Sequence, residues 1–268
     1  MSSPAASTPS VAPVPQINAV PLTRAVPEAI EYRDSQRLRP AQASRFSALR
    51  VEVELLRTMT YTVVDLETTG GDAERDGITE IGAVRLRGDQ VLGHFQTLVD
   101  PGINAGVSLP SFISELTGIT PAMLVSAPPV HDAVPAFFNF VQPGVLVAHN
   151  AGFDVSFLRE ACRWLQLSTS GLPTRVLDTA ELARRLVSDE VENCRLATLA
   201  YYFNARWAPT HRALADAFAT ADVARALLGR LARVGVHTVA QLMAFDQQTT
   251  RESQRPVLCQ LELDSTQR

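Results

Sequence analysis

The segment YTVVDLETTG, residues 61–70, has the pattern of a short buried strand that ends in two acids and a turn. Tyr61 to Leu66 is rich in apolar and β-branched residues, and the following Thr-Thr-Gly-Gly is typical of a turn. Side chains two residues apart in a strand point to the same side of a sheet, so we expect Asp65 and Glu67 to lie together. Two buried like charges repel and lose hydration unless a cation neutralises them. The pair therefore predicts a bound metal, and its oxygen ligands favour Mg²⁺ or Mn²⁺ over zinc.

The residues after the acids, Thr68, Thr69 and Gly70, are expected to bind substrate. Hydroxyl groups can form hydrogen bonds, and glycine allows another molecule to approach the backbone closely. A terminal nucleotide would fit such a turn. Taken alone, an Asp-x-Glu pair is more often a strand end with two solvated acids, so the metal interpretation needs ligands from elsewhere in the chain.

Patterns after this segment predict an α/β domain over residues 60–234. Residues 78–86 and 91–99 continue from the first strand as antiparallel strands joined by a Gly-Asp turn. Beyond them strands and helices alternate, with strands expected at 145–148 and 176–177 and helices at 110–116, 130–141, 153–167, 179–186, 196–203 and 213–234. This order predicts a mixed five-stranded sheet flanked by helices.

Both ends of the chain differ from this central pattern. Residues 1–40 are rich in Pro, Ala and Ser without periodicity, which predicts a disordered arm. Residues 41–59 carry apolar side chains at helical spacing and are expected to form a leading helix. Residues 235–268 are expected to hold a C-terminal helix and a polar tail that frays beyond about Thr249.

The composition favours one large cytoplasmic domain with appended tails. A chain of 268 residues that is 46% hydrophobic can bury one substantial core. No apolar run approaches the roughly 20 residues of a membrane span, and no basic residue precedes Arg24 to open a secretory signal. Three cysteines without close pairing argue for a reducing compartment, and against a disulfide or a zinc site. They are Cys162, Cys194 and Cys259.

The charge balance is less informative about partners. A net charge of -4 argues against a protein that holds nucleic acid by bulk positive charge, although a cluster of catalytic carboxylates would itself make the balance negative. All 24 basic residues are arginine. Arginine suits bidentate contacts to phosphate, but this usage is also what a GC-rich genome produces.

A second informative segment is HNAGFD, residues 149–154, directly after the strand expected at 145–148. It places Asp154 early in a helix that begins at the carboxyl edge of a strand, where ligands bind in open α/β sheets. Taken alone, Asp154 could equally complement the helix dipole. We expect His149 to orient neighbouring groups rather than to catalyse, and His149 and Asn150 to contact substrate.

The third segment is HRALADA, residues 211–217. His211 stands just before an Ala-rich helix, and Asp216 follows in its first turns, so one side chain can titrate while the other binds metal. Asp222 competes with Asp216 as the functional acid. Six helical residues rotate Asp222 well away from Asp216, so only one of the two can face a shared site.

Together the three segments resemble the DEDD exonucleases of the histidine subtype, the family that includes the proofreading epsilon subunit of bacterial DNA polymerase III. The resemblance covers residues 60–232, and shorter matches occur in the expected order at TEIG (79–82), LTGIT (116–120) and LDT (177–179). It implies a ribonuclease H-like fold and removal of nucleotides from the 3′ end of DNA in proofreading or repair. His211 matches the family's general base. The metal ligands by the same match are Asp65, Glu67, Asp154 and Asp216.

The resemblance also implies two divalent cations, Mg²⁺ or Mn²⁺. Such a pair would activate a water molecule on one side of the phosphodiester and stabilise the departing 3′ oxygen on the other. His211 would accept the proton of that water. The expected partner is therefore a nucleic acid 3′ end, single-stranded or frayed DNA.

Three alternatives remain open at this point. The substrate could be the 3′ end of RNA, because recognition of a 2′-hydroxyl depends on pocket geometry. The chain could be an interaction subunit tethered to a polymerase or a sliding clamp, since QLMAF at 241–245 resembles a clamp-binding peptide. Its apolar residues equally fit a terminal helix packed on the domain. A binding module with lapsed catalysis is disfavoured, because none of the five catalytic positions is missing.

Overall fold

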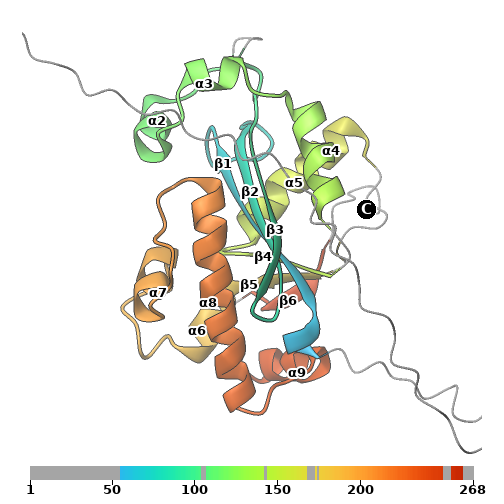
Figure 1. Cartoon of the computed structure of the whole chain (residues 1–268), viewed down its shortest axis with the longest axis vertical. Helices are drawn as coiled ribbons and strands as arrows, with labels where there is room; N and C mark the ends of the chain where they lie inside the picture. Colours follow the sequence, from blue (N-terminus) through green and yellow to red (C-terminus); the bar gives the residue numbers. More distant parts are fainter. Residues whose placement is uncertain are drawn as a thin grey trace, which may run out of the picture. The chain divides into compact units, whose positions relative to one another are not determined.

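In a computed structural model of the chain, the described residues are 55–103, 107–141, 144–167, 173, 175–249 and 255–261. All of them belong to the second of two units, Glu52–Arg268, drawn in colour in Figure 1. The arm predicted at 1–40 and most of the predicted leading helix lie outside the described residues. The described part of that helix is a strand bridge at Leu55 and one 3₁₀ turn, η2 (Leu56–Thr58), so no α-helix reaches residue 59.

A mixed six-stranded sheet with the order β3-β2-β1-β4-β5-β6 forms the centre of this unit. β1 (Thr60–Thr68), β2 (Ile78–Arg87) and β3 (Gln90–Leu98) form the predicted antiparallel meander. β4 (Val145–Ala148) lies parallel to β1, and β5 (Arg175–Asp178) lies parallel to β4. The predicted α/β class is therefore confirmed, and the carboxyl ends of β1, β4 and β5 meet at one edge of the sheet.

The sheet contains a sixth strand where five were predicted. This strand, β6 (Leu258–Gln260), pairs antiparallel with β5 and lies in the segment that was predicted to fray. Val257 is completely buried just before this strand, and its N–H donates to the carboxylate of Asp246 at 2.9 Å. The N–H of Asp178 in turn donates to the carbonyl of Val257. Contacts with distant residues order this short segment, and a three-residue strand carries no periodicity that would reveal it.

Helices cover both faces of the sheet (Figure 1). α8 (Ala213–Arg233) lies along one face, and α4 (Val130–Phe140) and α5 (Gly152–Leu165) pack on the other. The remaining helices are α2 (Ser111–Thr117), α3 (Pro121–Val125), α6 (Thr179–Leu186), α7 (Leu196–Tyr202) and α9 (Val239–Thr249). None of the helices within the described ranges combines the length and apolar character needed to cross a membrane.

The alternation of side chains along β1 determines where its acids point. Val63 belongs to the apolar core beneath α8, whereas Val64 belongs to the core beneath α4 and α5. Both valines are almost fully buried, so β1 is covered on both faces. Because side chains alternate along a strand, Asp65 and Glu67 share the side of Val63 and face α8.

The segment 241–245 lies within α9. The side-chain oxygen of Gln241 accepts hydrogen bonds from the N–H groups of His237 and Thr238, at 2.8 and 3.0 Å. The hydroxyl of Thr238 accepts one from the N–H of Gln241, so the two side chains cap the start of the helix reciprocally. Leu242 is fully buried in the core that also holds Leu227 and Leu231. These contacts support the interpretation of this segment as a packed terminal helix.

Candidate active site

The predicted acids gather at the carboxyl end of β1. Carboxylate oxygens of Asp65, Glu67 and Asp216 all lie within 4.8 Å of one another. Asp154, in the first turn of α5, accepts a hydrogen bond from the N–H of Leu66 at 3.1 Å, which brings it to the same strand end. Asp154 and Asp216 are buried, 4% and 6% exposed. The fold thus joins the three sequence segments into one cluster.

The cluster disfavours its own negative charge. Burial raises the pKa of Asp65 well above its ordinary value, and repulsion from Asp154, Asp216 and Glu67 raises it further. Burial and the neighbouring Asp216 raise the pKa of Glu67 to about 8. Burial also raises the pKa of Asp154 to about 8, although the Leu66 N–H favours its charged form. Ionising all of these acids at neutral pH therefore requires a compensating positive charge.

The donor set fits a hard divalent cation. The ligand atoms are all carboxylate oxygens, which Mg²⁺ and Mn²⁺ prefer, and no His or Cys belongs to the group. A cation at this point would remove the repulsion that raises the pKa values. The residues present therefore fit the metal that the sequence predicted.

His211 lies directly before α8 in a left-handed backbone conformation with φ of 56°. That conformation is uncommon for residues other than glycine, and such strain concentrates at functional sites. Burial raises the pKa of Asp216, whereas the N–H of Thr210, donating at 2.7 Å, and the nearby His211 lower it. His211 is exposed, and it interacts electrostatically with Asp216. It therefore lies at the surface beside Asp216.

Asp222 is engaged elsewhere. Its carboxylate accepts hydrogen bonds from the side chain and the N–H of Arg206, at 2.6 to 3.1 Å. A fourth contact comes from Arg225 at 3.4 Å. Its pKa is lowered because these hydrogen bonds outweigh its partial burial. Of the two candidate acids on α8, only Asp216 faces the cluster.

The turn after β1 differs in detail from expectation. The hydroxyl of Thr68 donates to the carbonyl of Gly70 at 2.6 Å, and that of Thr69 accepts from the N–H of Gly77 at 3.0 Å. A Cβ added to Gly70 would lie 2.4 Å from the carboxylate of Asp76, so a larger residue there would displace that side chain. Both threonines are buried, and their hydroxyls build the turn itself. Both hydroxyls are thus engaged within the turn, and substrate binding by Thr68, Thr69 and Gly70 stays a prediction.

His149, expected to orient neighbouring groups, is held by hydrogen bonding. Its Nδ1 lies 2.9 Å from the hydroxyl of Thr179, which donates to the carbonyl of Ala148 at 3.2 Å. A backbone hydrogen bond with Cys194 also favours the charged ring, so the tautomer of the neutral ring depends on which of the two partners receives its hydrogen. Burial lowers the pKa of His149 to about 4, which keeps the ring neutral at neutral pH. A general acid or base working near pH 7 needs a different environment.

Asp178, at the end of β5, supports the loop that carries Asn150. Its carboxylate accepts hydrogen bonds from the N–H groups of Asn150 and Ala151, at 3.1 and 2.9 Å. It also caps α6 through the N–H groups of Ala180 and Glu181. The LDT match at 177–179 did not by itself predict this role. An Asp that ends a strand and precedes a helix is an N-cap signal that could have indicated it.

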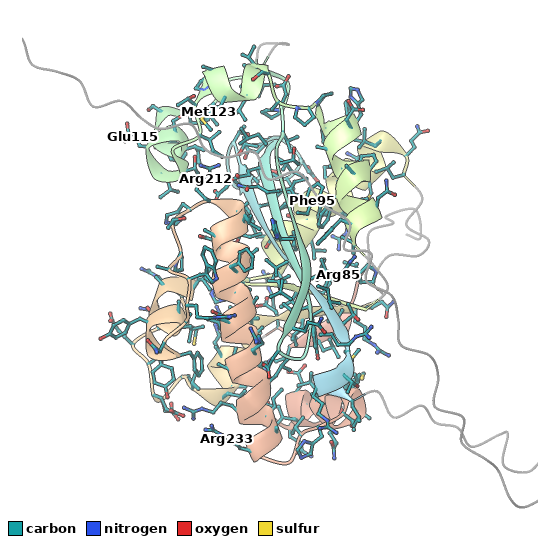
Figure 2. The ribbon with its side chains drawn as sticks, viewed as in Figure 1. Arg85, Phe95, Glu115, Met123, Arg212 and Arg233 are labelled. Atoms are coloured by element: carbon teal, nitrogen blue, oxygen red, sulfur yellow. The ribbon has the colours of Figure 1, made fainter. Side chains whose placement is uncertain are left out.

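Glu80 and Gly82, from TEIG, dock the start of α8 on β2. The carboxylate of Glu80 accepts from the guanidinium of Arg212, from the N–H of Ala213 and from the side chain of Gln96. A Cβ on Gly82 would lie 2.2 Å from the backbone of Ala213, so glycine allows the helix to approach the strand this closely. Figure 2 labels Arg212 at this end of α8. Sequence reasoning did not assign this positioning role.

A ribonuclease H-like mixed sheet with an acidic cluster at its carboxyl edge defines a nuclease. The chain belongs to the exonuclease family: the profile RNase_T, described as Exonuclease, matches residues 62–224.

Similar bacterial proteins share this region. The chain is 50% identical over 197 residues to a protein of Mycobacterium tuberculosis named as a bifunctional exonuclease/endonuclease, covering 71% of this chain and 30% of that protein. It is 40% identical over 182 residues to the PolC-type DNA polymerase III of Caldanaerobacter subterraneus, covering 68% of this chain and 12% of the polymerase. The Bacillus subtilis polymerase of the same type is 39% identical with the same coverage. The chain thus spans less than a third of each of these relatives.

Solved exonuclease structures share the fold. Exonuclease X in complex with 5′ overhanging duplex DNA superposes with a TM-score of 0.50 at 25% identity, covering 63% of this chain and 91% of that one. Escherichia coli Exonuclease I in complex with a dT13 oligonucleotide gives a TM-score of 0.57 at 19% identity, with coverage of 66% and 42%.

Proposed function

We propose that this protein is a 3′-to-5′ exonuclease that uses divalent metal to remove nucleotides from the 3′ end of DNA. The observation that carries the proposal is the carboxylate cluster of Asp65, Glu67 and Asp216, with oxygens within 4.8 Å, in a chain of the exonuclease family. The wide coverage of Exonuclease X, solved with DNA, supports DNA as the substrate. The PolC-type relatives support a role in proofreading or repair.

In this proposal each site residue has a defined task. Two Mg²⁺ or Mn²⁺ ions would activate the attacking water and stabilise the departing 3′ oxygen. His211 accepts the proton of the water, because it is exposed to solvent and adjoins Asp216. The backbone of the Thr68 to Gly70 turn, together with His149 and Asn150, contacts the terminal nucleotides. The ligands that hold the ions are Asp65, Glu67, Asp154 and Asp216.

The direct test is digestion of a single-stranded DNA, a duplex with a mismatched 3′ end and an RNA of the same sequence, each labelled at the 5′ end. With Mg²⁺ or Mn²⁺, a 3′-to-5′ exonuclease shortens the labelled DNA in single-nucleotide steps, and Asp65→Ala does not. Immediate release of a labelled mononucleotide would indicate the opposite polarity. Faster digestion of the RNA would favour the alternative, an exoribonuclease that trims RNA 3′ ends.

A polymerase or clamp partner is a secondary proposal. The match to a region of PolC-type DNA polymerases supports a function beside a polymerase. Clamp binding through residues 241–245 would require α9 to release Leu242 from the core. A clamp pull-down with Phe245→Ala tests it. Three cysteines without close pairing in the sequence support a reducing, cytoplasmic location.

A further inference from the structure

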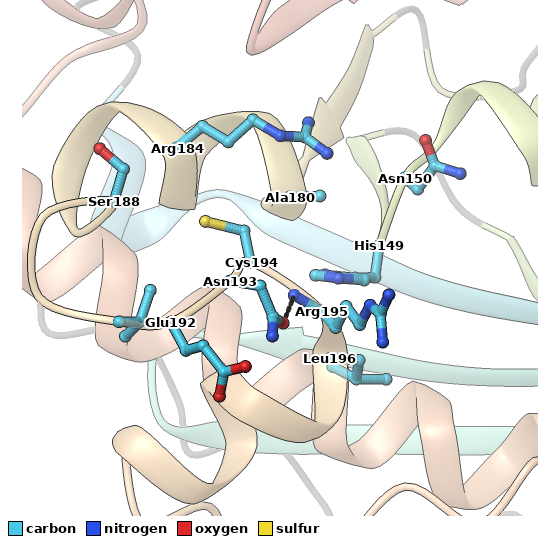
Figure 3. Close-up of a pocket in the computed structure, with 11 residues that line it drawn as sticks. His149, Asn150, Ala180, Arg184, Ser188, Glu192, Asn193, Cys194, Arg195 and Leu196 are labelled. Carbon is cyan, nitrogen blue, oxygen red and sulfur yellow. Dashed lines mark hydrogen bonds between the residues drawn. The ribbon is translucent and has the colours of Figure 1, made fainter.

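A second feature lies beside the acid cluster: an open cleft of about 700 Å³ between the end of β4 and the segment that joins α6 to α7. His149 and Asn150 line it from the β4 side, and Arg184 lines it from α6. Asn193 and Arg195 line it from the joining segment (Figure 3). The proposed chemistry leaves Arg184, Asn193 and Arg195 without a task.

Two arginines and one acid line the cleft. Figure 3 shows the guanidinium of Arg195 beside His149, and Arg184 extending from α6 toward Asn150. Among the described residues no carboxylate pairs with Arg195, whose side chain is exposed. Arg184 uses Nη1 to contact Glu181 at 2.6 Å and has further N–H groups to offer. Of the described residues that line the cleft, Glu192 is the one acid.

The backbone around Arg195 is well defined. Asn193 accepts a hydrogen bond from the N–H of Arg195 at 3.0 Å, drawn as the dashed line in Figure 3. The same side-chain oxygen accepts one from the hydroxyl of Thr198 at 2.8 Å. Asn193 therefore presents Arg195 from an ordered turn at the start of α7. Pre-ordering the backbone reduces the entropy that a ligand contact would cost.

The cleft and the acid cluster lie at the same carboxyl edge of the sheet. β1, β4 and β5 are parallel neighbours, so their carboxyl ends lie along one line. The acid cluster follows β1, and the cleft follows β4 and β5. Asp178 links the two regions, because its carboxylate holds the N–H groups of Asn150 and Ala151 and caps α6, which carries Arg184.

We infer that this cleft binds the phosphodiester backbone of a single DNA strand just upstream of the nucleotide being removed, with Arg195 and Arg184 contacting phosphates. The inference rests on the proposed function and specifies where the rest of the strand lies. Guanidinium groups match phosphate geometry and give charge-assisted hydrogen bonds. The neutral ring of His149 adds no charge, so the attraction comes from the two arginines.

The test compares a dinucleotide with a decanucleotide of single-stranded DNA as substrates for wild type, Arg195→Ala and Arg184→Gln. Arg233→Ala is the matched control, because Arg233 is exposed at the far end of α8 (Figure 2) and its loss changes the net charge equally. Wild type should have a lower KM for the decanucleotide. Each cleft variant should raise the KM for the decanucleotide by about tenfold and leave kcat and the KM for the dinucleotide near wild type. The dependence of log affinity on log salt concentration should become shallower by about 0.7 for each phosphate contact that is lost.

Failure of the inference and failure of the proposed function give different results. If both cleft variants match Arg233→Ala on the decanucleotide, or if they lower kcat and leave KM unchanged, the inference is wrong while the exonuclease stands. If wild type hydrolyses neither DNA, the proposed function fails. Binding of a fluorescent decanucleotide, with Ca²⁺ in place of Mg²⁺, then tests DNA binding by the cleft independently of hydrolysis. Equal affinities of Arg195→Ala and Arg233→Ala would contradict the inference.

Discussion

The buried carboxylate of Glu80 accepts two hydrogen bonds from the guanidinium of Arg212, at 3.0 Å from Nε and 2.8 Å from Nη2. Glu80 is 1% exposed and stands opposite Glu67 in the pairing of β1 with β2. Arg212 follows His211 directly and precedes α8. The ion pair therefore holds the segment that contains His211 and Asp216 against β2, next to the acid cluster.

Replacing Arg212 with Ala should destabilise the protein and also slow catalysis. A buried carboxylate left without its partner costs about 3 kcal/mol. We expect urea unfolding to show a loss of this size and kcat to fall, because His211 and Asp216 lose their support. The control is Arg206→Ala, which breaks the more exposed pair with Asp222 and should cost under about 1 kcal/mol. Equal effects of the two variants on stability would contradict the role assigned to Glu80 and Arg212.

Without metal, the protein should become less stable as pH rises. The pKa values of Glu67 and Asp154 are raised to about 8, so the folded state holds protons that the unfolded state has released between the ordinary carboxyl range and pH 8. The free energy of unfolding therefore falls with rising pH in that window. Melting temperatures measured in EDTA from pH 5 to 8 should decline, and saturating Mg²⁺ should remove most of the decline. Glu67→Gln should flatten the EDTA profile. An EDTA profile that is flat in wild type, or identical in the variant, would refute proton release from these acids as the cause.

Asp216 and Asp222 provide a matched pair of substitutions on one helix. Asp216→Asn should remove most exonuclease activity, because its carboxylate belongs to the metal cluster. Asp222→Asn should retain activity, because its carboxylate is bound by Arg206 and Arg225. Initial rates at saturating Mg²⁺ distinguish them, with circular dichroism to verify folding. An inactive Asp222→Asn beside an active Asp216→Asn would reverse the assignment.

His211→Asn should lower kcat by about 10²–10⁴-fold, the usual contribution of a general base. Asn tolerates the left-handed backbone at this position, so the variant removes the imidazole without adding strain. Imidazoles change charge within the working pH range, so the wild-type rate should rise with pH and the rise should flatten in the variant. Calorimetry should still show metal binding. A near wild-type rate with the same steep rise would mean that metal-bound water, and not His211, controls the profile.

Local patterns in the chain were sufficient to predict most elements that build the site. β1, β4 and α8 were predicted at nearly their observed bounds, because alternation, apolar runs and helical spacing depend on neighbouring residues. The acids were also identifiable, since each stands at a strand end or early in a helix. Helical spacing further indicated that Asp216 and Asp222 could not share one site.

Contacts between distant segments decided the rest. Arg206 binds the carboxylate of Asp222, whereas Asp216 belongs to the acid cluster. Helical spacing alone cannot predict which of the two acids faces the cluster. Pairing with β5 and burial of Val257 order β6, where too few residues exist for a periodic signal. Glu80, Asp178 and the cleft at Arg195 acquire their roles only when the sheet brings separate strand ends together. Such roles depend on which groups end up within hydrogen-bonding distance, and tertiary packing alone determines those distances.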